Sequence, residues 1–245
     1  MPSPDPLSIR ARIGGRTVSR GEVLDWEAQR LRRVCGKLNL SAPAGTVSDR
    51  RRRLLEHKLA IGRDGLERGL DRELRWSARS AAATRLLSAG RRRICTIELS
   101  GRSGSAERMP AFYRSAIDAG DDAVLLEACP DHYVLSRDRG GADVVLETTG
   151  GSPLAARIYL HEGDVGPVLT AADPDYPVQW VASGRAVADG PTLGAIRHQF
   201  RDEADGFRAI LTGEFPAALP PRMIRAHEWH LACEFSNWIE ACNSG

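Results

Sequence analysis

The chain has 245 residues, of which 42% are hydrophobic, and its formal net charge is +2. A chain of this length and apolar content can bury the core of one large domain, or of one domain with a helical extension. No apolar run reaches the ~18–20 residues of a membrane span, and the first residues lack the layout of a secretory signal, so we expect a soluble, cytoplasmic protein.

The small net charge hides a division along the chain. Residues 1–93 contain 22 Lys and Arg against 10 Asp and Glu, or +12, whereas residues 94–245 contain 12 against 22, or −10. Such asymmetry can mark a nucleic-acid-binding arm. However, no aromatic residues interleave the basic run DRRRRLLEHK to stack on bases. We therefore favour a basic helical layer docked on an acidic body over a nucleic-acid partner.

The cysteines are scattered, odd in number and without a CxxC pair. This argues against a disulfide scaffold and against a structural zinc knuckle. We expect small buried thiols, with the one nearest the end of the chain as the most exposed. In order, they are Cys35, Cys95, Cys129, Cys233 and Cys242.

Residues 1–90 are predicted to form a helical N-terminal portion. After a proline-rich start, Ser19 is a candidate cap for a helix that ends before the APAG segment. A longer helical pattern then resumes at TVSD, and Gly62, Gly65 and Gly69 are expected to divide it. The apolar stripes of the two patterns are Val23, Trp26, Leu31, Val34 and Leu38, and Leu54, Leu55, Leu59, Leu66, Leu70 and Leu74.

From residue 91 onward the apolar spacing becomes that of strands. ICTIELS alternates, SAERMPAFYRSAIDAG suits a short helix or a loop, and AVLLEA, HYVLSR, ADVVLETT, LAARIYLH and VQWVASGRAVA each suit a strand. LGAIRHQFRDEADGFRAILTGEFP predicts a hairpin, with Gly194, Ile196, His198 and Phe200 on one face of its first strand. The prolines at 220–221 then begin a final helix that runs to about residue 241.

Helices followed by an antiparallel meander and one long terminal helix predict an α+β fold in which the sheet curls around that helix. This helix-grip arrangement leaves a cavity between sheet and helix, which is a natural place for a small molecule. The predicted domains are the helical portion at residues 1–90 and the helix-grip domain at residues 91–245.

The terminal helix carries a candidate for metal chemistry. His230 and Glu234 are four residues apart, so they lie on one helix face and can bind one ion together. Alone this spacing is a weak signal, because exposed helices often carry such pairs. Two further candidates, His132 and Glu147, lie on neighbouring predicted strands. Two histidines and two carboxylates suit Zn²⁺ or a similar divalent metal.

At these residues the sequence resembles the diacetylphloroglucinol hydrolase family. The resemblance covers roughly residues 123–241 and is carried by PDHYV, LETTGGSPLAARIYL, IRHQFRDEADGFRAILTGEFP and HLACEFSNWI. It implies a helix-grip fold of the START/pollen-allergen type with extra N-terminal helices. It also implies a zinc-dependent hydrolase that cleaves a carbon–carbon bond between an acyl group and a phenolic ring. The zinc ligands implied are His132, Glu147, His230 and Glu234, with His198 as a pocket histidine beside the metal.

The residues that would hold the phenolic ring depart from the family pattern. Val124 and Leu135 stand where a tyrosine and an asparagine are expected, and AILTGEF replaces the aromatic strand RSRFW. We therefore expect another acylated aromatic or polyketide-like substrate, in natural-product metabolism. By the implied chemistry, zinc lowers the pKa of a water to near neutrality, and His198, with an ordinary pKa near ~6.5, protonates the departing carbon.

Other functions and structural roles remain open. A helix-grip protein could bind or cyclise a biosynthetic intermediate without hydrolysis, and an N-terminal nucleic-acid- or partner-binding module is suggested only by the basic charge. We expect a small-molecule substrate and neither an organic cofactor nor a membrane partner, and we leave a homodimer open. The structural alternatives are a solvent-facing His132, an exposed Glu147 paired with Arg157, a core His198 bonded to a backbone carbonyl, an Arg201–Asp202 salt bridge, and helix-surface positions for His227 and Glu228.

Overall fold

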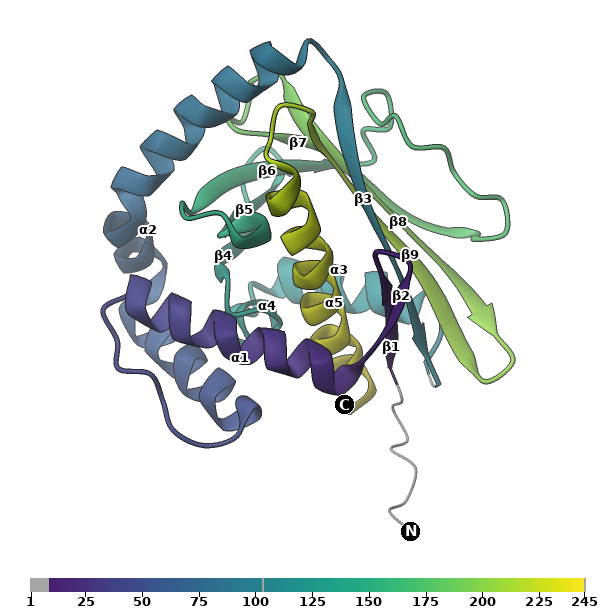
Figure 1. The fold of residues 1–245 in the computed structure, drawn as a ribbon, viewed down its shortest axis with the longest axis horizontal. Coiled ribbons are helices and arrows are strands. Elements are labelled where there is room, and N and C mark those ends of the chain that lie inside the picture. Colours follow the sequence, from purple (N-terminus) through teal and green to yellow (C-terminus); the bar gives the residue numbers. More distant parts are fainter. Residues whose placement is uncertain (1–8, 103, 245) are drawn as a thin grey trace.

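Within residues 9–102 and 104–244, which the computed structural model describes, nine strands form one antiparallel sheet in the order β2-β1-β3-β9-β8-β7-β6-β5-β4 (Figure 1). The strands are β1 (Arg10–Ile13), β2 (Arg16–Ser19), β3 (Arg92–Gly101), β4 (His132–Arg137), β5 (Asp143–Glu147), β6 (Ala156–Glu162), β7 (Val178–Arg185), β8 (Thr192–Glu203) and β9 (Gly206–Pro216). The helices are α1 (Arg20–Lys37), α2 (Val47–Ser88), α3 (Arg108–Ala119), α4 (Asp122–Glu127), α5 (Pro221–Ser244) and the short turn η1 (Thr149–Gly151). The predicted α+β class is confirmed.

The terminal helix α5 lies along the sheet, and α1 crosses it near its C-terminal end (Figure 1). Its apolar face includes Phe235, Trp238 and Ile239, which are each 2–3% exposed and pack in one cluster with Phe200 of β8 and Leu211 of β9. Burying one large apolar side chain contributes about 1.5–3 kcal/mol, so this face holds the helix on the sheet. No helix in the described part of the chain has both the length and the hydropathy needed to cross a bilayer.

The first N-terminal helix begins at the predicted cap, and the second begins in the same way. Ser19 caps α1 and Thr46 caps α2, each in a capping box that satisfies amides otherwise left without partners. Of the three glycines expected to divide the second helix, only Gly62 does so, with a non-helical backbone at φ 71°. The other two lie within regular helix.

Residues 10–19 correct the prediction of an entirely helical N-terminal portion. They form a hairpin, β1–β2, and β1 pairs antiparallel with β3 in the main sheet. Ala11, Ile13 and Val18 are buried, so a strand lets this short segment place its apolar side chains on the core. The hairpin escaped prediction because each strand has only four residues, too few for a clear alternation.

One predicted strand, AVLLEA, is also wrong, because most of it belongs to helix α4. Asp121 accepts a hydrogen bond from the Val124 amide and caps this helix, while Leu125 and Leu126 enter the core. A short apolar run fits either structure, and packing decides between them. The hairpin predicted over β8 and β9 is confirmed, with Asp202 opposite Phe207 in its register.

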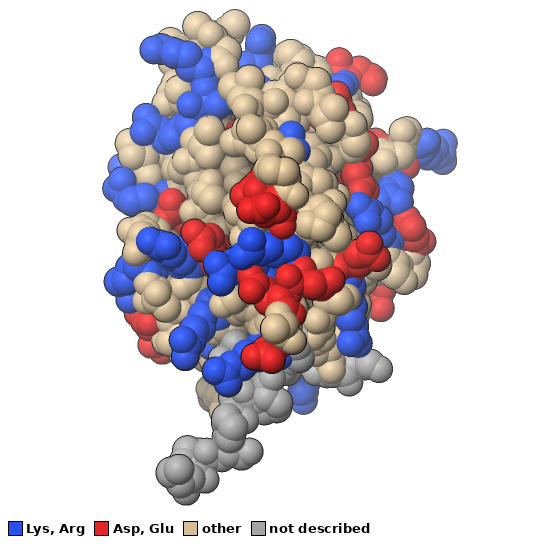
Figure 2. Space-filling model, turned by 90° about the vertical axis from the view of Figure 1, so that its right-hand side faces the viewer, with Lys and Arg blue, Asp and Glu red and all other residues tan. Residues whose placement is uncertain are grey.

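Ion pairs join the basic N-terminal helices to the more acidic remainder of the chain. They link Arg20 to Glu240, Arg30 to Asp131 and Arg63 to Asp122. Figure 2 shows the side of the molecule that faces away from α2, and basic and acidic side chains lie beside each other there.

A cavity of about 250 Å³ lies between the sheet, α5 and the second half of α2. Its walls are mostly apolar. They include Leu160 and Trp180 from the sheet, Leu231 and Phe235 from α5, and Ala81 from α2. The predicted cavity between sheet and terminal helix is therefore present, and α2 adds a wall that the sequence did not indicate.

Candidate metal centre

Four side chains converge beside the cavity, and two of them, Glu147 and Glu234, line it. His132 begins β4 and Glu147 ends β5, and the two lie opposite each other in the strand register, so their side chains share a face. His230 and Glu234 lie one turn apart on α5. His132 Nε2 lies 3.3 Å from Glu234 Oε1 and 3.7 Å from Glu147 Oε2. His230 Nε2 lies 3.3 Å from Glu147 Oε2 and 3.8 Å from Glu234 Oε2. The structure thus brings together the four residues predicted as ligands.

Burial makes this arrangement costly without a further partner. His132 and His230 are 0% and 1% exposed, and the Nε2 atom of each lacks a hydrogen-bond partner. The side chains of Glu147 and Glu234 are only 8% and 13% exposed. Buried polar nitrogens and carboxylates must be compensated, and a divalent cation between them would satisfy both kinds of group. The donor set therefore fits a metal ion.

Contacts outside the cluster orient its ligand atoms inward. His132 Nδ1 lies 3.1 Å from the Leu125 carbonyl, which can only accept, so Nδ1 carries the proton and Nε2 has a free lone pair. Thr149 Oγ1 donates to Glu147 Oε1 at 2.8 Å, which leaves Oε2 facing the histidines. Such outer hydrogen bonds are typical of protein metal sites, where they fix the tautomer and the orientation of each ligand.

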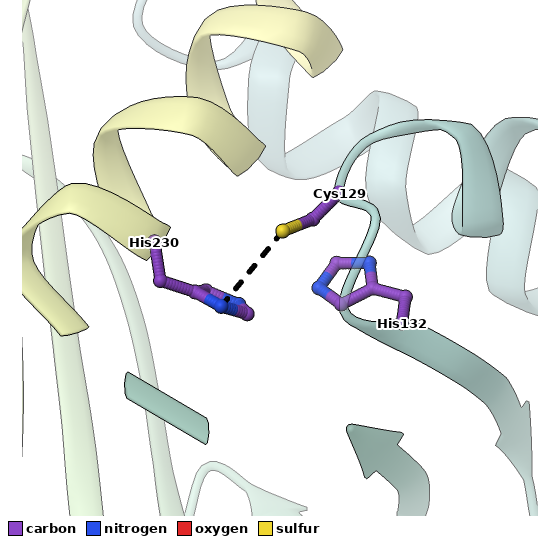
Figure 3. A group of neighbouring side chains, drawn as sticks. All are labelled: Cys129, His132 and His230. Atoms are coloured by element: carbon purple, nitrogen blue, oxygen red, sulfur yellow. Dashed lines mark hydrogen bonds between the residues drawn. The ribbon is translucent and has the colours of Figure 1, made fainter. Parts of the chain in front are cut away.

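Cys129 is a further member of the cluster, and the sequence analysis missed it. Its sulfur lies 3.8 Å from His230 Nδ1, and Cys129, His132 and His230 form a buried group that could hold a metal ion (Figure 3). The spacing of Cys129 and His132, with two residues between them, was the available signal. His230 turns Nδ1 toward the Cys129 thiol and Nε2 toward the carboxylates. An ion could therefore be held either by Cys129, His132 and His230 or by the four predicted ligands.

The pKa shifts of the cluster residues show that its carboxylates favour a nearby positive charge. Burial opposes ionisation of Glu147, but His230 and His132 outweigh it and hold the pKa of this carboxyl below its usual range. Burial also disfavours a charged His230, but Cys129 and Glu147 outweigh it and hold the pKa of this imidazole well above its ordinary value. A metal ion in the cluster would take over the compensating role of the proton on His230.

His198 lies on β8 in the wall of the same cavity. It is 3% exposed, and its ring lies 5.0 Å from that of Phe235 and 5.5 Å from that of Trp180. Burial lowers the pKa of His198 to about 3, so the assumption of an ordinary value near 6.5 is wrong. The imidazole is neutral at neutral pH, and its buried Nδ1 lacks a hydrogen-bond partner.

His227 corrects the expectation of a helix-surface position. It is 8% exposed, lines the cavity and stacks on His230 with ring centroids 5.2 Å apart. Burial, together with the nearby His230, lowers the pKa of His227 to about 3. Glu228, the next residue along the helix, points in another direction and is only partly buried.

The burial and ion pairing of individual residues decide several of the structural alternatives and one prediction about a cysteine. Glu147 is buried, and Arg157 pairs instead with Glu67 at 2.6 Å. Arg201 pairs with Glu203 at 2.8 Å rather than with its neighbour in the chain. Cys242 is the most exposed of the five cysteines, as expected, but at 7% it is still buried like the other four thiols.

The depressed pKa of His198 predicts an acid sensitivity. The unfolded chain binds a proton below the ordinary pKa of 6.5 that the folded chain excludes until about 3, so stability is full above 6.5 and falls as the pH drops. We expect His198 to cost about 2 kcal/mol of unfolding free energy at a pH of about 5. Urea unfolding at neutral and acidic pH should show a smaller loss in His198→Gln, whereas the exposed His57→Gln should behave like the wild type. An equal loss in all three proteins would contradict the assignment.

No model of a known protein family matches the chain, and no curated protein sequence is significantly similar to it.

Proposed function

We propose that the chain is a metal-dependent hydrolase that cleaves the carbon–carbon bond between an acyl group and an aromatic or polyketide-like body. One observation carries the proposal: two buried imidazole nitrogens without hydrogen-bond partners face the carboxylates of Glu147 and Glu234, which line an apolar cavity. His132, Glu147, His230 and Glu234 would hold the ion. Their nitrogen and oxygen donors suit Zn²⁺ and leave room for water or substrate.

The fold supports the resemblance to helix-grip hydrolases. From β3 onward the chain runs through one strand, two helices, six further strands and one long helix, with β3 paired to β9. We propose that this part is a START-like helix-grip domain, to which β1, β2 and the first two helices are additions. The site then lies where such folds bind small molecules, between sheet and terminal helix.

The cavity favours an uncharged substrate. Among the described residues that line it, Arg157 is the only Lys or Arg, and Glu67 neutralises it. Glu214, which also lines the cavity, accepts from the amides of Leu169 and Thr170. A carboxylate or phosphate would therefore find no free cationic side chain and would face the carboxylates of the ion site. An acyl ketone with an apolar body fits these walls.

The reaction would consume one water. A carbon–oxygen bond forms at the acyl carbon, the bond from that carbon to the ring or enol carbon breaks, and the latter carbon takes a proton. A divalent ion held by the cluster would supply Lewis-acid polarisation and a lowered pKa for water. His198 Nδ1, which lacks a partner, could relay this proton. Burial lowers the pKa of His198 to about 3, which makes it a weak base, so it would depend on the ion to acidify the water. The same lowered pKa makes its imidazolium a strong acid that passes the proton to the departing carbon.

Turnover in isotopically labelled water tests the proposal. The zinc-loaded protein should convert a member of a panel of acyl-aromatic ketones into a carboxylic acid and the deacylated arene, with one labelled oxygen in the acid. His198→Gln should retain zinc and lose most of this activity, since general acid–base catalysis contributes about 10²–10⁴-fold. Absence of labelled acid with every ketone that binds would overturn the hydrolase.

The apolar walls also favour a second candidate, a protein that binds or cyclises an intermediate without hydrolysis. Trp180 and Trp238 line the cavity, so ligand binding should quench their fluorescence. Quenching by a ketone that remains intact, or that is recovered as a ring-closed isomer without labelled oxygen, would favour this candidate.

Substitution of Cys129 distinguishes the two overlapping ligand sets. If the carboxylates hold the ion, Cys129→Ala should retain one ion per chain and lose only about 10–100-fold in affinity, as for an outer contact of His230. Glu147→Gln should lose the ion. Metal analysis after gel filtration measures both, and the reverse pattern would assign the ion to Cys129, His132 and His230.

A further inference from the structure

Residues 128–132 connect α4 to β4 and carry both Cys129 and His132. All five residues are buried, so the polar groups of this segment need partners within the protein. Ala128 O accepts from Asn237 Nδ2 at 2.8 Å, and the Asp131 carbonyl accepts from the Thr148 amide at 3.1 Å. Within the segment, the His132 amide donates to Cys129 O at 3.2 Å. Two further partners, Lys58 and Arg30, come from the N-terminal helices, far away in sequence.

Lys58 of α2 binds the backbone on both sides of Asp131. Its Nζ donates to Pro130 O at 2.8 Å and to His132 O at 2.5 Å, and the lysine is 1% exposed. The β4–β5 register shifts immediately after His132, and such a bulge re-aims a side chain and leaves ladder groups unpaired. One ammonium group thus holds two carbonyls at the bend that turns His132 toward the cluster.

Arg30 of α1 holds the side chain between those carbonyls. Its guanidinium forms two parallel hydrogen bonds to Asp131, at 2.7 and 2.6 Å, and both residues are buried. A bidentate pair fixes direction as well as distance. Together the two cations fix three consecutive residues of the segment, and the third of these is His132.

We propose that Lys58 and Arg30 are positioning residues of the metal centre, which hold the buried 128–132 segment so that His132 faces His230 and Glu234. This inference rests on the proposed function, because it requires an ion in the cluster. It also gives the basic N-terminal helices a role in the site, although Lys58 and Arg30 bind the segment and not the atoms that would hold the ion. Without these contacts, His132 would sample orientations in which its Nε2 leaves the cluster.

Ion affinity and coordination spectra test the proposal. Zn²⁺ affinity is measured by competition with a chromophoric chelator, and the visible bands of the Co²⁺-loaded protein report ligand geometry. Lys58→Met should weaken Zn²⁺ binding by about 10–100-fold and change the Co²⁺ bands. Arg30→Met should do the same, and Arg30→Lys, which keeps the charge but loses the fork, should have an intermediate effect.

A double substitution separates positioning from stability. Arg30→Met alone leaves Asp131 buried and unpaired, whereas Arg30→Met with Asp131→Leu removes both charges and should restore much of the lost stability. The affinity of the double variant should nevertheless stay weak, because the segment remains unclamped. Val18→Ala, buried in β2, is the control that lowers stability without touching the segment, and it should bind Zn²⁺ as the wild type does.

The outcomes discriminate between the two proposals. Two results would overturn the positioning role alone. In the first, the wild type binds Zn²⁺ and the Lys58 and Arg30 variants bind it with the same affinity. In the second, the Zn²⁺ affinity of the double and control variants simply follows their unfolding midpoints. A folded wild type that binds neither Zn²⁺ nor Co²⁺ would overturn the positioning role together with the proposed function.

Discussion

Substitution of the α5 ligands is expected to abolish metal binding. Protein purified without a histidine tag should hold about one divalent ion per chain, as its four converging donors predict. His230→Ala and Glu234→Gln should each weaken binding by more than the ~10–100-fold seen for outer contacts, because each removes a donor atom. Metal analysis and chelator competition measure both effects. A folded wild type without metal, or an ion retained in both variants, would contradict the site.

Glu228→Gln is the matched control on the same helix. Glu228 is only partly buried and lies outside the cluster, so this variant should retain the ion. Thermal unfolding gives a second readout, because an ion at 1,000 times its dissociation constant stabilises the folded state by about 4.1 kcal/mol. A chelator should therefore lower the unfolding temperature of the wild type and of Glu228→Gln, but not that of His230→Ala.

The four cluster residues could be predicted because each depends on local geometry. His230 and Glu234 share a face by helical spacing alone. His132 and Glu147 lie on consecutive strands joined by a short turn, so they had to be close in the sheet, and the structure places them opposite each other. What could not be derived was that the two pairs meet, since this depends on how α5 lies on the sheet.

Residues that matter through tertiary contacts escaped the sequence analysis. Cys129 was expected to be no more than a small buried thiol, because nothing local showed its sulfur beside His230. His227 looked like a surface residue, because the width of the buried helix face depends on how closely η1 and the sheet approach it. The buried Lys58 was hidden in a basic run, where composition predicts solvated charge.

The charge asymmetry along the chain is a further feature whose structural meaning depends on tertiary contacts. A surplus of arginines predicted a layer docked on an acidic body, and ion pairs such as Arg30 with Asp131 bear this out. Composition alone could not show that this pair is buried beside the candidate site rather than exposed at a rim. Buried and surface pairs look alike in sequence, yet the loss of one partner is far more costly in the interior.

Gly150 in η1 is expected to be essential for the site as well as for stability. Its backbone has φ 53°, and a Cβ there would clash with the carbonyl oxygen of Met223 and lie 3.0 Å from His227 Cβ, both on α5. Gly150→Ala should therefore push η1 from the helix and move Thr149, which orients Glu147. We expect a loss of about 2–5 kcal/mol from backbone strain and overpacking, together with weakened ion binding. Urea unfolding and chelator competition measure the two effects.

Gly151→Ala separates the clash from the backbone strain. Gly151 has a similar φ of 70°, but a Cβ there would meet no backbone atom within 4 Å, and its nearest neighbour would be the Ala226 Cβ at 3.3 Å. This variant should carry only the strain of about 1–2 kcal/mol and keep its ion. Because η1 connects Glu147 and Thr149 to the ligand-bearing helix, a greater loss of ion affinity in Gly150→Ala would show that their close packing sets the metal geometry. Equal affinity in the two variants would show that the carboxylate keeps its place independently of this contact.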